Sequence, residues 1–216
     1  MTSAPHLTFN PPITRSNKRV LASLLIDQTL SMGGCHESIL HADDIDQILP
    51  RAFKHTHQQV VRAKTRAEVF TPAWICNAQN NLLDEQWFGR PNVFNVETVT
   101  ADGCHVWEST TQPIVFTADK PWLKYVQSRR IEFTCGEAPY LASRYDTTSG
   151  LEIPLNKRIG ILDRKFRVIN ENTPHTANEN SRRIWLNKAF MALQSTYGFD
   201  MQHDYVFLAR ENIFNT

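Results

Sequence analysis

The sequence predicts an α/β fold in which the second half of the chain alternates strands and helices. The short run IEFT, residues 131–134, is followed by the turn Cys135-Gly136. The run TYGFD, residues 196–200, ends on an acid. Helical sequence separates these two runs and follows the second. A strand, a glycine turn, helices and a second strand with an acid at its tip make half of a nucleotide-binding α/β unit.

The composition is that of a folded protein with one sizeable core. The 216 residues include 23 basic and 22 acidic side chains, so the formal net charge is +1 and neither requires nor excludes a nucleic-acid partner. No apolar run approaches the length of a membrane span, and the N-terminal sequence lacks the apolar stretch of a secretory signal. We therefore expect no membrane partner and a cytoplasmic location.

The sequence gives no sign of a metal site or a disulfide framework. The chain has four widely spaced cysteines, none of them in a Cys-x-x-Cys pair: Cys35, Cys76, Cys104 and Cys135. Reduced thiols in a cytoplasm are the expected state. His55 and His57 are two residues apart, a spacing that does not place both on one face of a helix.

Residues 1–64 are expected to form an N-terminal arm and a helical region. Prolines among polar residues predict an extended arm over residues 1–16. Helical patterns follow, and the second of them has acids early and bases late, as suits the helix dipole. Basic side chains concentrate in this third of the chain and just after it: Arg15, Lys18, Arg19, Arg51, Lys54, Arg62, Lys64 and Arg66. A helix with these residues fits the phosphates of double-stranded DNA, but a solvated helix face explains the same pattern.

Residues 65–216 are expected to hold the other elements. Apolar residues at helical spacing predict helices, and a run rich in Val, Thr and aromatic residues around Asp102-Gly103 predicts a hairpin. Besides the two strands, we expect a helix over 72–87, the hairpin over 92–117, a short helix over 120–128, and helices from Glu137 onward, over 154–170, over 182–194 and over 203–214. A polar connection over 171–181 precedes the helix at 182.

The first strand and the acid of the second suggest where a ligand lies. Small residues in Cys135-Gly136-x-Ala138 would let the backbone approach a ligand at the carboxyl end of the strand. Asp200 is placed to accept hydrogen bonds from two ribose hydroxyls. The alternative is structural, with Gly136 serving only the turn and Asp200 capping the last helix.

Three motifs, taken in order, resemble the cofactor-binding part of adenine-specific DNA methyltransferases from restriction–modification systems. The first is Glu68-Val69-Phe70-Thr71-Pro72 before a helix, and the second runs from Ile131 to Leu141 as IEFTCGEAPYL. The third is Tyr197-Gly198-Phe199-Asp200, followed by the helix motif Ala209-Arg210-Glu211-Asn212-Ile213. The second motif departs from the family at two positions, because Phe133 replaces a proline and Ala138 replaces the second glycine.

The resemblance implies a partial Rossmann-like, S-adenosylmethionine-dependent methyltransferase core over residues 65–216. In the family, the Phe-Thr-Pro element lies against the methionine end of the cofactor. Here Thr71 would cap the helix and offer its hydroxyl to the methionine carboxylate, and Pro72 suits the first helical turn. Glu132 would lie near the cofactor's ammonium group; its alternative role is that of a surface carboxylate beside two arginines. Phe199 or Met201 would border the adenine.

The expected cofactor is S-adenosylmethionine. The residues expected to bind it are Phe70, Thr71, Pro72, Glu132, Cys135, Gly136, Ala138, Asp200 and Met201. These are binding residues, and the sequence nominates no catalytic residue among them.

The catalytic motif of the family, Asn or Asp followed by Pro-Pro and an aromatic residue, does not follow the third motif. The sequence FNPPI at Phe9–Ile13 has Ile13 where the stacking aromatic belongs, and we interpret it as part of the arm. We expect the cofactor-binding portion of an adenine-specific DNA methyltransferase that is inactive alone, either a split subunit or a truncated relative. A split subunit would have a complementary methyltransferase or restriction subunit as its partner. The alternatives are a catalytically silent relative that acts as a DNA-binding, assembly or regulatory module, and a binding module with no cofactor.

Overall fold

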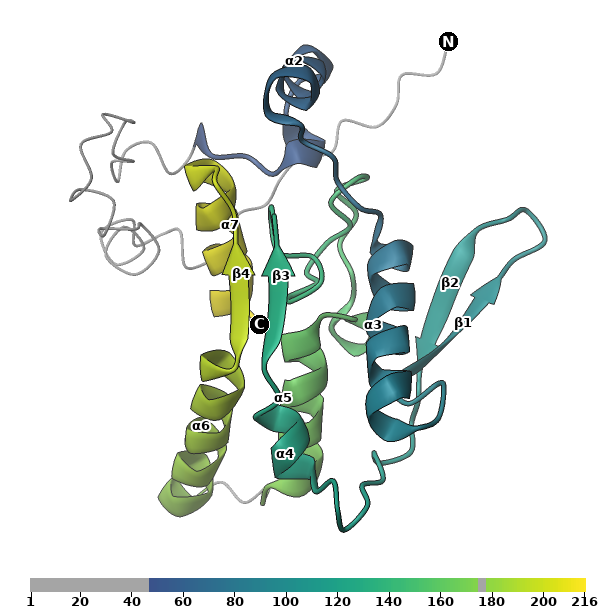
Figure 1. The fold of residues 1–216 in the computed structure, drawn as a ribbon, viewed down its shortest axis with the longest axis vertical. Helices are drawn as coiled ribbons and strands as arrows, with labels where there is room; N and C mark the ends of the chain where they lie inside the picture. The colour runs from purple at the N-terminus through teal and green to yellow at the C-terminus, as the bar shows by residue number, and fades with distance from the viewer. Residues whose placement is uncertain (1–46, 175–177) are drawn as a thin grey trace.

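A computed structural model describes residues 47–174 and 178–216 and contains both helices and strands, as expected (Figure 1). The elements, in chain order, are η4 (Arg51–Phe53), α2 (Thr56–Arg66), α3 (Ala73–Phe88), β1 (Asn95–Val99), β2 (His105–Ser109), α4 (Trp122–Val126), β3 (Arg130–Phe133), η5 (Leu155–Lys157), α5 (Ile161–Asn172), α6 (Glu179–Gln194), β4 (Thr196–Phe199) and α7 (His203–Phe214). The strands form two separate two-stranded sheets.

The predicted strands of the second half, β3 and β4, pair in parallel. Ile131 lies opposite Tyr197, and Phe133 lies opposite Phe199. α5 and α6 connect the two strands, and the carboxyl ends of both strands point toward α2 (Figure 1). A Cβ atom at Gly198 would lie 3.1 Å from the Sγ of Cys135, so the loop after β3 closes over the sheet where β4 has no side chain.

The predicted hairpin is also confirmed. β1 and β2 pair antiparallel, with Val99 opposite His105. Gly103 lies in the turn with φ of +82°, a conformation that glycine adopts at no steric cost. The hairpin lies against α3, where the side-chain amides of Asn77 and Asn95 bond each other (Figure 1).

The main hydrophobic core joins α4, α5 and α6 to the segments around the hairpin. Its buried members are Val93, Phe94, Ile114, Tyr125, Val126, Leu162, Val168, Ile169 and Ala192. A buried ion pair crosses from α3 to α5, with 2.6 Å between Arg164 Nη1 and Asp84 Oδ2. The hydroxyl of Tyr125 donates to the other oxygen of Asp84 at 2.9 Å. The carboxylate therefore keeps strong partners inside the core, as burial of a charge requires.

The helix expected from Glu137 is wrong, because residues 134–160 form turns, bends, an isolated bridge and the short η5 but no α-helix. Thr134, Gly136 and Ala138 all have positive φ, between 52° and 60°, and a right-handed helix cannot pass through such residues. Glu137 is fully buried, and its carboxylate accepts from the backbone N–H of Arg51 and the hydroxyl of Tyr145.

Two of the other expected elements differ at their ends. The helix expected over 154–170 begins only at Ile161, where Asp163 accepts a hydrogen bond from the backbone N–H of Gly160 at 3.0 Å. The helix expected over 182–194 begins earlier, at Glu179, because the side chain of Asn178 accepts from the N–H of Ser181. The polar connection is shorter as a result.

α2 is held against the core by charged side chains. Lys54 and Arg62 both pair with Asp204, at 2.9 and 2.8 Å, and Arg62 also pairs with the buried Glu68. The hydroxyl of Tyr205 donates to Glu68 at 2.6 Å. In residues 47–174 and 178–216, no helix is both long enough and apolar enough to cross a membrane.

Candidate functional site

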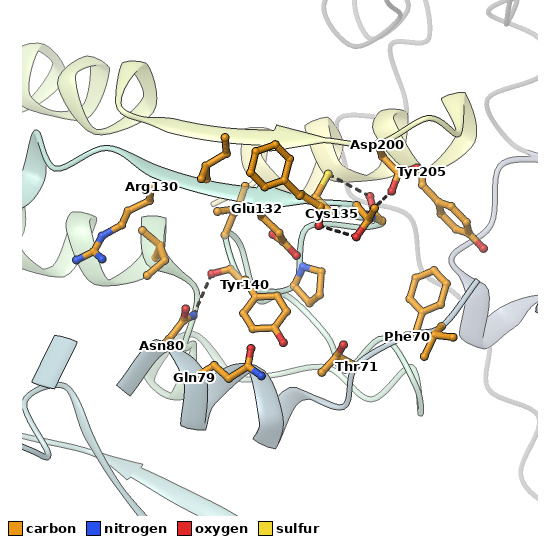
Figure 2. A pocket seen from close by; sticks show the side chains of 18 of the residues that line it. Phe70, Thr71, Gln79, Asn80, Arg130, Glu132, Cys135, Tyr140, Asp200 and Tyr205 are labelled. Carbon is orange, nitrogen blue, oxygen red and sulfur yellow. Dashed lines mark hydrogen bonds between the residues drawn. The ribbon is translucent and has the colours of Figure 1, made fainter. Parts of the chain in front are cut away.

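A cavity of about 1010 Å³ lies where the three motifs meet (Figure 2). Its walls are the segment before α3, one side of α3, the edge and carboxyl end of β3, and the residues just after β4. We call it the central cavity. Seven of the nine residues expected to bind a ligand line it: Phe70, Thr71, Glu132, Cys135, Gly136, Asp200 and Met201.

The other two expected residues lie outside the cavity wall. Ala138 is fully buried in a small cluster with Cys135, Leu141 and Ala209. Pro72 immediately precedes the first residue of α3. The structure therefore places these two as supports of the loop and of the helix beside the cavity.

Phe70 joins the first motif to the second. Gly136 has φ of +53°, and a Cβ atom there would lie 3.4 Å from Cε1 of Phe70. The ring also packs edge-on against Tyr205 of α7, with 5.1 Å between ring centroids. Glycine at 136 thus serves the backbone conformation and the close approach of Phe70 together.

Asp200 joins the second motif to the third. Its Oδ2 accepts from the N–H of Gly136 at 2.8 Å, and its Oδ1 accepts from the N–H of Gln202 at 2.8 Å (Figure 2). These contacts hold the loop after β3 to the start of α7. A carboxylate oxygen can accept more than one hydrogen bond, so each oxygen keeps capacity for a ligand hydroxyl.

Glu132 is a carboxyl group with an unmet hydrogen-bonding need. Burial raises its pKa to about 8, against the backbone N–H groups of Tyr140 and Leu141, which lower it. Among the described residues, its Oε2 is buried and has no hydrogen-bond partner. Figure 2 shows Glu132 on the side of the sheet that faces Tyr140 and α3. A ligand that brings an N–H donor or a positive charge would satisfy this oxygen.

The amino end of α3 differs from the expectation, because Thr71 does not cap it. The residue at the cap position is Pro72, whose side chain makes no hydrogen bond to the helix. The N–H of Ala73 instead donates to Oδ2 of Asp146 at 2.7 Å. Burial alone would raise the pKa of Asp146, but hydrogen bonds from Thr148, Ala73 and Ser149 hold the pKa below its ordinary value. The Asp146 carboxylate thus takes the N–H that we expected a ligand carboxylate to bind.

Sequence reasoning missed several residues of the site. Asp146 precedes Thr-Thr-Ser-Gly, a pattern typical of a carboxylate that accepts from its own turn, and this signal could have been noticed. Asn80 of α3 donates to the carbonyl oxygens of Tyr140 and Ile159, at 3.0 Å each, and so ties α3 to the loop. The sequence carries no signal that separates this buried amide from an exposed one.

The two thiols beside the cavity are not activated. Burial raises the pKa of Cys76 and of Cys135 to about 12, so both are neutral at physiological pH. No group of three or more His, Cys, Asp and Glu side chains that could hold a metal ion occurs in the described parts of the chain. The geometry is that of a binding site, with a carboxylate, a buried carboxyl group and an apolar wall.

Some of the expectations concern residues that the structure does not describe. Phe9–Ile13 and the basic residues Arg15, Lys18 and Arg19 lie outside the described residues. Comparison of the chain with protein-family models, with curated proteins and with solved structures finds no match.

Proposed function

We propose that the central cavity binds S-adenosylmethionine, and that the chain is the cofactor-binding portion of an adenine-specific DNA methyltransferase of a restriction–modification system. One observation carries the proposal. The three motifs that resemble this family are up to about 130 residues apart, yet Phe70, Gly136 and Asp200 meet at one cavity. The parallel pair β3–β4 would then be part of a Rossmann-like sheet, with the ligand beyond its carboxyl ends.

The groups in the cavity fit the chemistry of this cofactor. Asp200 has acceptor capacity for ribose hydroxyls, and the free Oε2 of Glu132 suits the ammonium group. The methionine carboxylate needs a donor other than Ala73, and Arg66 and Gln79 line the cavity with donors. The cofactor itself would supply the methyl group.

Methyl transfer to an adenine needs a further part that takes the base out of the stack and holds its amino nitrogen. None of the three motifs provides such a part. We propose that the chain alone does not methylate DNA, and that a complementary methyltransferase or restriction subunit provides the base-holding loop. Double-stranded DNA would be gripped in part by basic residues of the first third, of which Lys54 and Arg62 are already engaged by Asp204.

Two departures favour the alternative, a catalytically silent relative that acts as a DNA-binding, assembly or regulatory module. Asp146 occupies the amino end of α3, and the loop after Gly136 does not lead into a helix. Both remove backbone N–H groups that could bind an anionic ligand.

The test is incorporation of labelled methyl groups from S-adenosylmethionine into mixed bacterial DNA. We expect no incorporation by the chain alone, and incorporation when a subunit with an Asn-Pro-Pro-aromatic motif is added. Asp200→Ala should abolish the reconstituted activity, whereas Asp102→Ala in the distant hairpin turn should not. Incorporation by the chain alone that is lost in Asn10→Ala would overturn the proposal and assign catalysis to Phe9–Ile13. Cofactor binding without incorporation under any condition would support the silent relative.

A further inference from the structure

β3 has one edge that no strand covers. The N–H of Arg130 donates to the carbonyl of Ser195 beside β4 at 2.9 Å. Because successive backbone groups of a strand point to opposite edges, those of Arg130 and Glu132 face β4, and those of Ile131 and Phe133 face the other way. Among the described residues, β3 pairs only with β4. The N–H groups of Ile131 and Phe133 and the carbonyl of Ile131 are thus open on the side of β3 that faces α3, whereas the carbonyl of Phe133 already accepts from the hydroxyl of Thr134 at 2.6 Å.

The open edge is flanked by exposed apolar side chains. Ile131 is 53% exposed and Phe133 is 70% exposed, and across the cavity on α3 Leu82 and Leu83 are exposed as well. Parallel sheets are ordinarily covered on both faces, and an isolated pair of strands is marginally stable. An uncovered strand edge with apolar surroundings is a template for another strand.

The central cavity extends along this whole edge, from Arg130 to Phe133, with α3 as the opposite wall. Its volume of about 1010 Å³ is at the upper end of the range usual for small-molecule sites, about 300–1,000 Å³. Of the residues proposed to bind the cofactor, only Glu132 lies within β3, and it contributes its side chain rather than its backbone. The others lie beyond the carboxyl end of β3, as the separation of Arg130 from Phe70 in Figure 2 shows. The edge itself is therefore left for a second occupant.

A positive charge in this part of the cavity lacks a close partner. Nε and Nη2 of Arg130 are buried without a hydrogen-bond partner among the described residues. The nearest acid, Asp84, has its Oδ1 3.8 Å from Nη2 and is already bonded by Arg164 and Tyr125. The charge of Arg130 also contributes, after burial, to lowering the pKa of Lys165 to about 7. An incoming carboxylate would complement this surplus of positive charge.

We propose that the open edge of β3 binds an extended β-strand of a partner protein, which enters between β3 and α3, pairs with the backbone of Ile131 and Phe133 and brings an acidic side chain to Arg130. Pairing of β3 with β3 of a second copy does not fit, because that edge lies in the same recess beneath the α3 of its own copy. The proposal deepens the proposed function by naming where a complementary subunit docks. The test of strand binding uses no cofactor, so its result is independent of whether the cavity binds S-adenosylmethionine.

The test uses the purified chain and three synthetic peptides, with amide exchange followed by NMR. The first peptide is acetyl-Thr-Val-Glu-Val-Thr-Val-Lys-amide, which alternates apolar residues with polar ones. The second has Lys in place of Glu, and the third is the first with every backbone nitrogen methylated, so that neither of its edges can donate to a strand. In the free chain, we expect the amides of Ile131 and Phe133 to exchange quickly and that of Glu132 to be protected.

The first peptide should slow exchange at Ile131 and Phe133 by at least about tenfold, since these amides gain partners. The second peptide should bind at least about tenfold more weakly, and the third should have no effect. Arg130→Met should remove the preference for Glu over Lys, with retained protection at Glu132 as the check on folding. Phe133→Pro, which removes one outward N–H, should weaken binding of the first peptide, and Phe133→Ala is its control for the lost ring.

Two results would overturn the proposal. One is protection of Ile131 and Phe133 in the free chain, which would show that the edge is already paired. The other is unchanged exchange at both amides with the first peptide at millimolar concentration. Protection that is equal with the Glu and Lys peptides would refute the role of Arg130.

Discussion

The two sheets in the described parts of the chain each have two strands, but they differ in how they are made and in which residues they bring together. In β1–β2 the strands are joined by a five-residue turn, Thr100–Cys104, so pairing is local. In β3–β4 the strands are joined by a loop and two helices, and their register depends on tertiary packing. The local sheet can form around its turn, and Glu108 and Ser109 at the end of β2 line a second cavity of about 1220 Å³. The non-local sheet brings the three distant motifs to one place, and the candidate site lies there.

The ion pair between Asp84 and Arg164 links the two sheets, since α3 lies against the hairpin and α5 follows the loop of the parallel pair. Arg164→Met should cost about 3–5 kcal/mol, because it leaves the Asp84 carboxylate buried with a distant cation as its only ion partner. Chemical denaturation of the unmodified chain and of the variant measures this loss of unfolding free energy. The control Lys157→Met breaks the exposed pair with Glu108 and should cost less than about 1 kcal/mol. Equal losses in the two variants would contradict the view that α3 and α5 are joined by a buried charge.

A change that damages only the non-local sheet is Gly198→Val. The new side chain would meet Cys135 Sγ and Leu141 Cδ1, at 3.1 and 3.2 Å from its Cβ. Overpacking of this kind costs about 1–3 kcal/mol. It should also move the loop that carries Gly136 and so weaken ligand binding in the cavity. Thermal unfolding and ligand titration on the same variant test both effects, and a stable variant with unchanged binding would show that the loop is not packed as described.

The counterpart in the local sheet is Gly103→Ala. Nothing lies within 4 Å of the added Cβ, so the cost is only that of φ at +82°, about 1–2 kcal/mol. Because the turn is remote from the cavity, ligand binding should not change. Loss of binding in this variant would show that the conformation of the hairpin turn affects the central cavity, contrary to the view that the two sheets are independent.

Two buried carboxyl groups, in β3 and in the loop after it, should make stability depend on pH. The pKa of Glu132 is raised from 4.5 to about 8, and that of Glu137 from 4.5 to about 7, in both cases first by burial. The folded state then holds these protons at a pH where the unfolded state has lost them, so each group makes stability fall as pH rises from its unfolded to its folded pKa. Lys165, whose pKa burial lowers to about 7, acts in the opposite direction above pH 7 and makes stability rise. Relative to the unmodified chain, Glu132→Gln should therefore make the slope of stability against pH more positive up to about pH 8, and Glu137→Gln should do so only up to about pH 7. Unfolding free energies measured from pH 5 to 9 test this, and a profile of Glu132→Gln parallel to that of the unmodified chain would contradict it.

The elements that sequence reasoning placed well are those with local signals. The hairpin is marked by Asp102-Gly103, and both strands of the parallel pair are short apolar or aromatic runs with a glycine turn or an acid at the end. Residues 134–160 could not be predicted in the same way. Their conformation depends on the burial of Glu137, whose carboxylate accepts from Tyr145 in the same segment and from the N–H of Arg51, 86 residues earlier in the chain.

The candidate site shows the same division. The convergence of Phe70, Gly136 and Asp200 follows from motif order on an α/β unit, and the structure brings these residues together. The sequence around Asp146 predicts a carboxylate that accepts hydrogen bonds from its own turn, but it does not predict the bond from Ala73 at the start of α3. The free Oε2 of Glu132 and the open edge of β3 result from tertiary packing. No sequence pattern shows that a polar atom or a strand edge will lack a hydrogen-bond partner in the folded chain.

The central claim is that the cavity at the ends of the parallel pair is a cofactor site. Calorimetric titration of the folded chain with S-adenosylmethionine tests it most directly, with Asp200→Ala and the hairpin variant Asp102→Ala beside it. The account predicts saturable binding by the chain and by Asp102→Ala, and binding weakened by about 1–3 kcal/mol in Asp200→Ala, because ribose hydroxyls enclosed in the cavity would lose their acceptor. A flat titration at millimolar cofactor, or equal affinity in all three proteins, would contradict it.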